Sequence, residues 1–264
     1  MNGAWKHPLP VGLRSLWLAV ELSGIAINYV LRVLCRAENC RMEARVQWLQ
    51  WACRRVIRVF SLEIRAVGPI PKKGLLVSNH LSYLDILVLS ALTPSVFVAK
   101  REVKRWPVFG WFARLAGTLF VDRERRIRVG PVAKRLQTLL DQGALVVLFP
   151  EGTSSDGQKV LPFKSALLEP AANSSHPVSV SAIEYDLRDG DVGEEVCYWK
   201  DMTFLPHLVN LLSKGRIAAS VRFCEVQHGS ADRKQLARRL HAEVSRLRGP
   251  TPSHLPRARF VSNG

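Results

Sequence analysis

A histidine and an aspartate lie five positions apart in the stretch VSNHLSYLDIL, which covers residues 77 to 87. A histidine can take a proton from a hydroxyl near neutral pH, and a carboxylate on its other ring nitrogen orients the ring and stabilises the imidazolium. Positions five apart on one helix are separated by about 140° around the axis, so His80 and Asp85 can meet only if a turn precedes the helix. Ser82 as a helix N-cap, with an apolar run from Leu84, predicts that turn. Taken alone, however, the spacing fits an ordinary polar turn at least as well.

No motif for an enzyme nucleophile accompanies this pair. The sequence lacks G-x-S-x-G, H-E-x-x-H and G-x-x-x-x-G-K-[ST]. A histidine and an aspartate without a nucleophile of their own predict that a hydroxyl group of the substrate attacks. A hydrolase that activates water with the same pair stays open at this point.

Two further reactive groups follow apolar runs, as His80 follows GLLVSN. Arg123 follows GTLFV, and Glu151 follows ALVVLF. Ligand sites in α/β folds gather where strands end and loops begin, so these three positions predict one site. The charge run DRERRIR around Arg123 also fits a solvated surface, and Glu151 could equally be a structural partner at a helix start.

Short apolar runs alternate with helical patterns after Phe60. The predicted strands cover residues 62–67, 74–79, 95–100, 117–121, 144–149, 177–185 and 217–226. The predicted helices cover residues 84–92, 108–115, 129–140 and 231–247. This alternation predicts an α/β fold with a mixed, largely parallel β-sheet flanked by helices. The strands are nearly all apolar, which is typical of a sheet covered on both faces.

The first 60 residues have a different pattern. Residues 13–34 are mostly apolar but contain Glu21, which is costly in hydrocarbon, so a helix lying on the membrane is favoured over a simple transmembrane span. Residues 41–60 predict a basic amphipathic helix, which would lie among lipid headgroups or pack its stripe on the protein's own core. Its apolar face holds Val46, Leu49, Cys53, Val56, Ile57 and Phe60, and its other face holds Arg41, Arg45, Arg54, Arg55 and Arg58 with Trp48 and Trp51.

Three units follow from these patterns. Residues 1–60 are predicted to be membrane-binding helices, residues 61–249 an α/β domain, and residues 250–264 a disordered tail. The net charge of +16 predicts an anionic partner, and four of the seven tryptophans fall in the first 51 residues, which favours a lipid surface. No nucleic-acid-binding motif is present, so nucleic acid is not expected as a partner. Five cysteines without a C-x-x-C predict neither a disulfide framework nor a zinc site, and they fit a reducing cytosolic face.

Four blocks in order resemble the glycerolipid acyltransferases of the lysophosphatidate acyltransferase (PlsC) type. The first block, N-H-x-x-x-x-D, is matched by Asn79, His80, Ser82 and Asp85; the second, AKREVKRWPVFGWFARLAGTLFVDR, carries Lys100, Pro107, Gly110, Gly117 and Arg123; the third, FPEGT with PFKSALL, carries Glu151, Gly152, Thr153 and Lys164; the fourth is Pro177. The resemblance covers roughly residues 75 to 183.

This resemblance implies transfer of a fatty acyl group from an acyl-CoA or acyl carrier protein thioester to the hydroxyl of a lysolipid, without a metal or cofactor. His80 would be the general base and Asp85 its partner. The residues implied to bind substrate are Asn79, Ser82, Lys100, Arg123, Glu151, Gly152, Thr153 and Lys164. The expected location is the cytoplasmic face of the inner membrane, with the lipid bilayer as a partner.

One position departs from the family pattern. Family members acting on lysophosphatidate usually continue the third block as E-G-T-R, whereas Ser154 stands in place of the arginine. Relatives that acylate lyso-ornithine lipid also have small polar residues after E-G-T, and a zwitterionic headgroup needs less positive charge. Both acceptors stay open, with lysophosphatidate in front, and a lipid-binding protein without catalysis is the third alternative.

Overall fold

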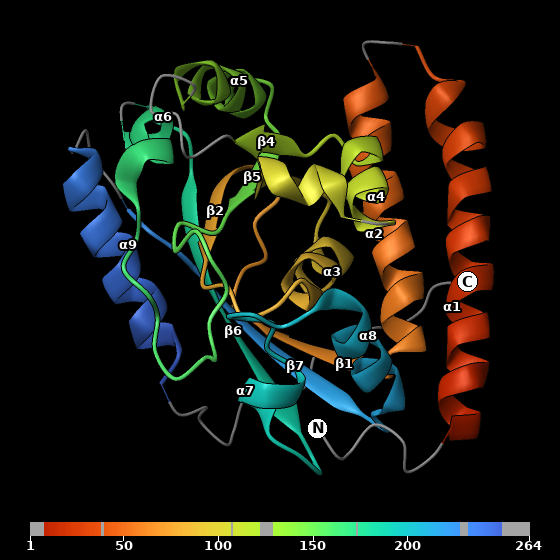
Figure 1. The fold of residues 1–264 in the computed structure, drawn as a ribbon. Helices are drawn as coiled ribbons and strands as arrows, with labels where there is room; N and C mark the ends of the chain where they lie inside the picture. Colours follow the sequence, from red (N-terminus) through yellow and green to blue (C-terminus); the bar gives the residue numbers. More distant parts are fainter. Residues whose placement is uncertain are drawn as a thin grey trace.

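The computed structural model describes residues 8–37, 40–106, 108–121, 129–172, 174–227 and 232–249. Within these ranges the strands form one seven-stranded sheet in the order β1-β7-β6-β2-β5-β3-β4 (Figure 1). The strands are β1 (Leu62–Val67), β2 (Gly74–Ser78), β3 (Val96–Lys100), β4 (Leu119–Val121), β5 (Leu145–Leu148), β6 (Val178–Leu187) and β7 (Ile217–Glu225). Neighbours pair in parallel except β6 and β7, which are antiparallel. The predicted mixed, largely parallel sheet is confirmed.

Helices cover both faces of this sheet (Figure 1). On one face are α1 (Pro8–Tyr29), continued by the π-helical turn η1 (Val30–Leu34), and α2 (Arg41–Val59), α3 (Leu84–Leu92), α4 (Phe109–Leu115) and α8 (Phe204–Ser213). On the other are α5 (Val129–Asp141), α6 (Glu169–Ala172) and α9 (Arg233–Leu247). The short elements η3 (Arg101–Arg105), η5 (Ser165–Leu167) and α7 (Val192–Glu195) lie in the connections.

The central strands are almost entirely apolar because helices cover both faces of the sheet. Every residue of β2 and β5 is buried, so their runs GLLVS and LVVL have no polar alternation. The edge strand β1, with sequence LEIRAV, alternates between more buried and more exposed positions. Because β2, β5 and β3 are parallel neighbours, their carboxyl ends meet at one edge of the sheet.

Helix α1 is fastened to the domain by charged side chains. Glu21 is buried against α2, where Arg55 donates to both carboxylate oxygens at 2.5 and 3.0 Å, and Trp17 Nε1 donates to it at 3.1 Å. Two turns earlier than Glu21, Arg14 donates to the carbonyl of Leu212 at 3.1 Å and to Ser61 Oγ at 3.0 Å. The carboxylate that interrupts the apolar run therefore faces the protein.

The opposite side of α1 and of its continuation η1 is apolar and exposed. Leu13, Leu16, Val20, Ile27 and Leu31 have between 62% and 69% of their surface accessible. We call these five residues the α1 stripe. Among the described residues, the helical run Val11–Leu34 is the one long and apolar enough to cross a membrane by length and composition. Membrane contact by the N-terminal segment remains a prediction, and the α1 stripe is the surface that would make it.

Helix α2 packs on the protein rather than presenting its apolar stripe outward. Its buried residues include Cys53 and Val56, and the helix lies against α3 and α1. The placement of Trp48 on the arginine face is wrong: this side chain is 2% exposed and its Nε1 donates to the Ile25 carbonyl at 3.1 Å. Trp48 lies at the edge of the apolar face of α2, and its indole is large enough to reach across to α1. Burial of the ring between the two helices is favourable.

Candidate active site

The carboxyl end of β2 places His80 in a turn, and Asp85 is the second residue of α3. His80 Nδ1 lies 2.8 Å from Asp85 Oδ2. The same oxygen accepts the backbone N–H groups of Leu81 at 2.7 Å and Ser82 at 3.0 Å. An ionised carboxylate only accepts, so Nδ1 carries the proton and donates, which leaves the lone pair on Nε2. Nε2 can therefore receive a proton from a substrate.

Tyr185 from β6 completes the surroundings of the carboxylate. Its hydroxyl donates to Asp85 Oδ1 at 2.7 Å. Burial, reinforced by the neighbouring Asp85 charge, raises the pKa of Tyr185 well above its ordinary value, so the hydroxyl keeps its proton and remains a donor. Sequence alone did not indicate Tyr185 as a site residue, because it stands as an ordinary aromatic at the end of an apolar strand, 100 positions from its partner.

Asn79 and Ser82 do not expose their side chains to a substrate in this geometry. The Asn79 amide donates to the Ile183 carbonyl at 2.9 Å and accepts the Ile183 N–H at 2.8 Å, so both of its polar atoms bind the backbone of β6. Ser82 is fully buried, and its hydroxyl has no hydrogen-bond partner among the described residues. The prediction that Ser82 caps α3 is wrong, because the Asp85 carboxylate reaches back to the free N–H groups instead.

Glu151 joins the third block to the first. Its carboxylate is 3% exposed and accepts the backbone N–H of His80 at 3.0 Å and that of Leu161 at 3.2 Å. The N–H of Ser155 returns a hydrogen bond to the His80 carbonyl at 3.1 Å. Burial raises the pKa of Glu151 to about 7, against the lowering effect of these N–H donors. Glu151 therefore fixes the turn that carries His80.

The other predicted residues lie around this centre. Gly152 has a φ of +78°, a conformation that favours glycine, and it allows the turn after Glu151. Thr153 and Lys164 are exposed, and the Lys164 N–H donates to the Pro150 carbonyl at 2.9 Å. Lys100 is exposed at the carboxyl end of β3, the same edge of the sheet as His80. Arg123 lies outside the described residues.

An aromatic group adjoins the turn. The His80 ring stacks on Phe149 with centroids 4.2 Å apart. Tyr83, buried in the next turn, contacts the rings of Phe109, Tyr198 and Phe204 at 5.3 to 5.4 Å. Two of these rings, Tyr198 and Phe204, come from one stretch of the sequence, YWKDMTFLPHL. They give the site an apolar wall next to its base.

Comparison with known proteins agrees with this fold and identifies the family. The family model described as Acyltransferase matches residues 61–184. A lyso-ornithine lipid O-acyltransferase of Brucella abortus is 40% identical over 210 residues, which cover 74% of this chain and 79% of that protein. A 1-acyl-sn-glycerol-3-phosphate acyltransferase of Neisseria gonorrhoeae is 38% identical over 149 residues, 53% of this chain and 58% of that protein.

The crystal structure of the 1-acyl-sn-glycerophosphate acyltransferase PlsC from Thermotoga maritima has the same fold. It superposes with a TM-score of 0.59 and 20% sequence identity, covering 92% of this chain and 99% of that one. Together with the geometry around His80, these similarities show that the chain belongs to the acyltransferase family. It is an O-acyltransferase, as the four sequence blocks predicted.

Replacement of Tyr185 by Phe tests the fourth donor to Asp85. With one donor fewer, the carboxylate holds the His80 ring less firmly in the position and tautomer that proton transfer needs, so we expect kcat to fall about tenfold. KM should change little. The measurement is kcat and kcat/KM from pH 5 to 9.

The matched control is Tyr83→Phe, which removes an equally buried hydroxyl that bonds His207 Nδ1 at 3.0 Å rather than Asp85. The other titratable groups facing the pair, Glu151 and Cys197, are intact in both variants. Equal kcat values in the two variants would show that Tyr185 contributes packing alone.

Replacement of Glu151 by Gln tests the buried carboxyl. Its pKa of about 7 in the folded chain lies above the ordinary 4.5, so the unfolded state loses this proton first as pH rises. The free energy of unfolding should therefore fall by about 3 kcal/mol between pH 4.5 and 7 in the wild type and fall less in Glu151→Gln. Denaturant unfolding at several pH values measures this, with the exposed Glu63→Gln as the control; equal slopes in all three proteins would contradict the expectation.

Proposed function

We propose that the chain transfers a fatty acyl group from a thioester donor to the free hydroxyl of a lysolipid at the cytoplasmic face of the cell membrane. The observation that carries the proposal is the His80–Asp85 contact at 2.8 Å, which leaves Nε2 as the base in a chain of the acyltransferase family. No group of three or more metal-binding side chains occurs among the described residues, and the mechanism uses only protein side chains.

The reaction then proceeds in one transfer step. His80 Nε2 takes the proton of the acceptor hydroxyl as its oxygen attacks the thioester carbonyl. Asp85 stabilises the imidazolium that forms, and it holds the ring through the Nδ1 hydrogen bond. The new C–O bond forms, the C–S bond breaks, and the departing thiolate takes the proton from Nε2. The products are the ester and the free thiol, and His80 returns to its starting state.

Lyso-ornithine lipid is the acceptor that we place first. The similarity to the Brucella abortus lyso-ornithine lipid O-acyltransferase extends over 79% of that protein, further than the similarity to the Neisseria gonorrhoeae enzyme, at 58%. Ser154 supports the same acceptor, since it supplies no cation for a phosphomonoester and its hydroxyl donates to the Tyr198 carbonyl. Lysophosphatidate, first on the sequence alone, is the second candidate because the Neisseria gonorrhoeae relative is named for it.

Access to the lipid would come through the N-terminal helices. The α1 stripe exposes large apolar side chains, and burial of such side chains in the acyl region of a bilayer is favourable. The net charge of +16 also attracts the chain to membranes with anionic headgroups. Residues 1–60 are thus proposed as the membrane-binding unit and residues 61–249 as the catalytic domain, with Lys100, Lys164, Gly152 and Thr153 near the substrates.

An acceptor panel tests the function. Purified protein is offered acyl-CoA or acyl carrier protein thioester with lyso-ornithine lipid, lysophosphatidate, glycerol 3-phosphate or water, and the products are identified by mass spectrometry. We expect ornithine lipid to form fastest, and His80→Ala to reduce the rate by at least about a thousandfold because the base is lost. Thioester hydrolysis without acyl transfer would instead identify a hydrolase, and full activity in His80→Ala would remove the mechanism.

Vesicle binding tests the membrane surface. Replacing Leu16, Val20 and Ile27 together by Ser removes apolar area from the α1 stripe, so partitioning onto vesicles of anionic lipid should weaken by about a hundredfold or more. Co-sedimentation measures the partition coefficient, and Ile70→Ser, at an apolar residue exposed outside the helices, is the control. Undiminished binding of the triple variant would exclude the α1 stripe as the membrane contact.

A further inference from the structure

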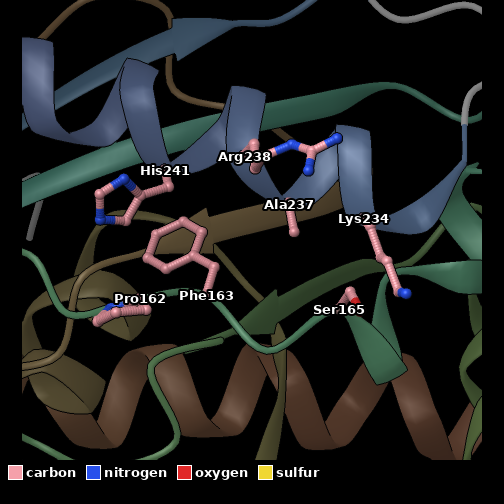
Figure 2. Close-up of a pocket in the computed structure, with 7 residues that line it drawn as sticks. All are labelled: Pro162, Phe163, Ser165, Lys234, Ala237, Arg238 and His241. Atoms are coloured by element: carbon pink, nitrogen blue, oxygen red, sulfur yellow. The ribbon is translucent and has the colours of Figure 1, made fainter.

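A hollow lies between α9 and the segment that follows the third block. Helix α9 covers the face of the sheet opposite α1 (Figure 1). The hollow has a volume of about 470 Å³. We call it the α9 pocket, and its lining residues are Pro162, Phe163, Ser165, Lys234, Ala237, Arg238 and His241 (Figure 2). None of them has been assigned a role above.

The spacing of the α9 residues explains the hollow. Positions 234, 237, 238 and 241 share one face of a helix, so they all border the segment 162–165. Ala237 is the small member of this row and leaves the space between the longer side chains on either side. Phe163 lies below His241 (Figure 2), edge to face with centroids 5.2 Å apart, so the pocket has an aromatic wall.

The charge of the pocket is uncompensated. Lys234 and Arg238 are exposed at its rim, and the described residues that line it include no acidic side chain. Neither has an ion pair among the described residues, whereas Arg233 on the same helix pairs with Glu169 at 2.7 Å. Two free cations beside an aromatic ring suit a ligand that carries phosphate groups and a flat ring.

The segment that borders the pocket is hydrogen-bonded, through the neighbouring residues Leu161 and Lys164, to Glu151 and Pro150. The Leu161 N–H donates to Glu151, whose other oxygen holds the backbone of His80. The Lys164 N–H donates to the carbonyl of Pro150. A ligand in the α9 pocket would therefore lie along the segment that starts at the catalytic turn.

We propose that the α9 pocket binds the adenosine 3′,5′-bisphosphate end of a coenzyme A thioester. Lys234 and Arg238 bind the phosphates, and the adenine packs on Phe163 and His241. The water-soluble end of the donor then lies on the face away from the α1 stripe, while the thioester reaches His80. This inference rests on the proposed acyl transfer, because it concerns the donor of that reaction.

The first experiment measures binding without catalysis. The full-length His80→Ala protein in detergent micelles is titrated calorimetrically with adenosine 3′,5′-bisphosphate. We expect one saturable site, weakened about tenfold by each of Lys234→Ala and Arg238→Ala, since each removes a charge-assisted contact. The matched control is Arg246→Ala, which removes a cation that is paired with Glu243 on the same helix, and its affinity should be unchanged. No binding to the parent protein, or equal loss in all three variants, would overturn the proposal.

The second experiment compares donors. In the otherwise wild-type enzyme, Lys234→Ala and Arg238→Ala should raise KM for acyl-CoA about tenfold and leave KM for acyl-pantetheine and for the lysolipid unchanged. An equal effect on both donors would overturn the assignment to the nucleotide. Transfer from acyl carrier protein alone, with no bisphosphate binding, would refute the pocket assignment while acyl transfer stands. Bisphosphate binding in a protein that transfers to no lysolipid would refute the proposed function instead.

Discussion

The buried carboxylate of Asp85 is the interaction on which the site depends. It is fully buried, and a buried charge is tolerated only when donors surround it. Its donors are backbone N–H groups and the His80 ring in the turn after β2, and the Tyr185 hydroxyl on β6. Because Asp85 itself belongs to α3, one anion joins three parts of the fold. The position of the ring, its tautomer and the start of α3 all follow from satisfying this charge. The proposed base and the local fold are therefore held by the same interaction.

The surrounding sheet makes this arrangement possible. Asn79 binds the backbone of β6 through both ends of its amide, which sets the register between the catalytic turn and the strand that carries Tyr185. Glu151, from the end of β5, holds the other side of the turn. The parallel order of β6, β2 and β5 brings these groups to the same edge. Each contact uses backbone N–H groups or carbonyls that a strand end leaves unpaired.

The sequence predicted those parts of the fold that follow from local pattern. The sequence predicted β2 and β5 because a strand buried on both faces of the sheet is a continuous apolar run. It predicted the limits of α3 because the start and end of a helix depend on neighbouring residues. The pairing of Asp85 with Tyr185 could not be predicted in this way, since it joins residues 100 positions apart. Helix periodicity placed Trp48 on the wrong side because it takes no account of how far a large side chain can reach. Ser82 does not cap α3, because the carboxylate of Asp85, three positions later, accepts the free backbone N–H groups at the helix start.

The segment from Glu151 to Lys164 is bonded along both of its sides. On one side Ser155 bonds to the His80 carbonyl; on the other, Arg248 donates to the Gly157 carbonyl and His241 Nε2 lies 3.2 Å from the Val160 carbonyl. A segment held in this way cannot open as a lid without also releasing the catalytic turn. Its amide hydrogens should exchange with solvent in one cooperative event together with those of residues 80–82. A substrate that reaches the proposed base would therefore do so with this segment in place.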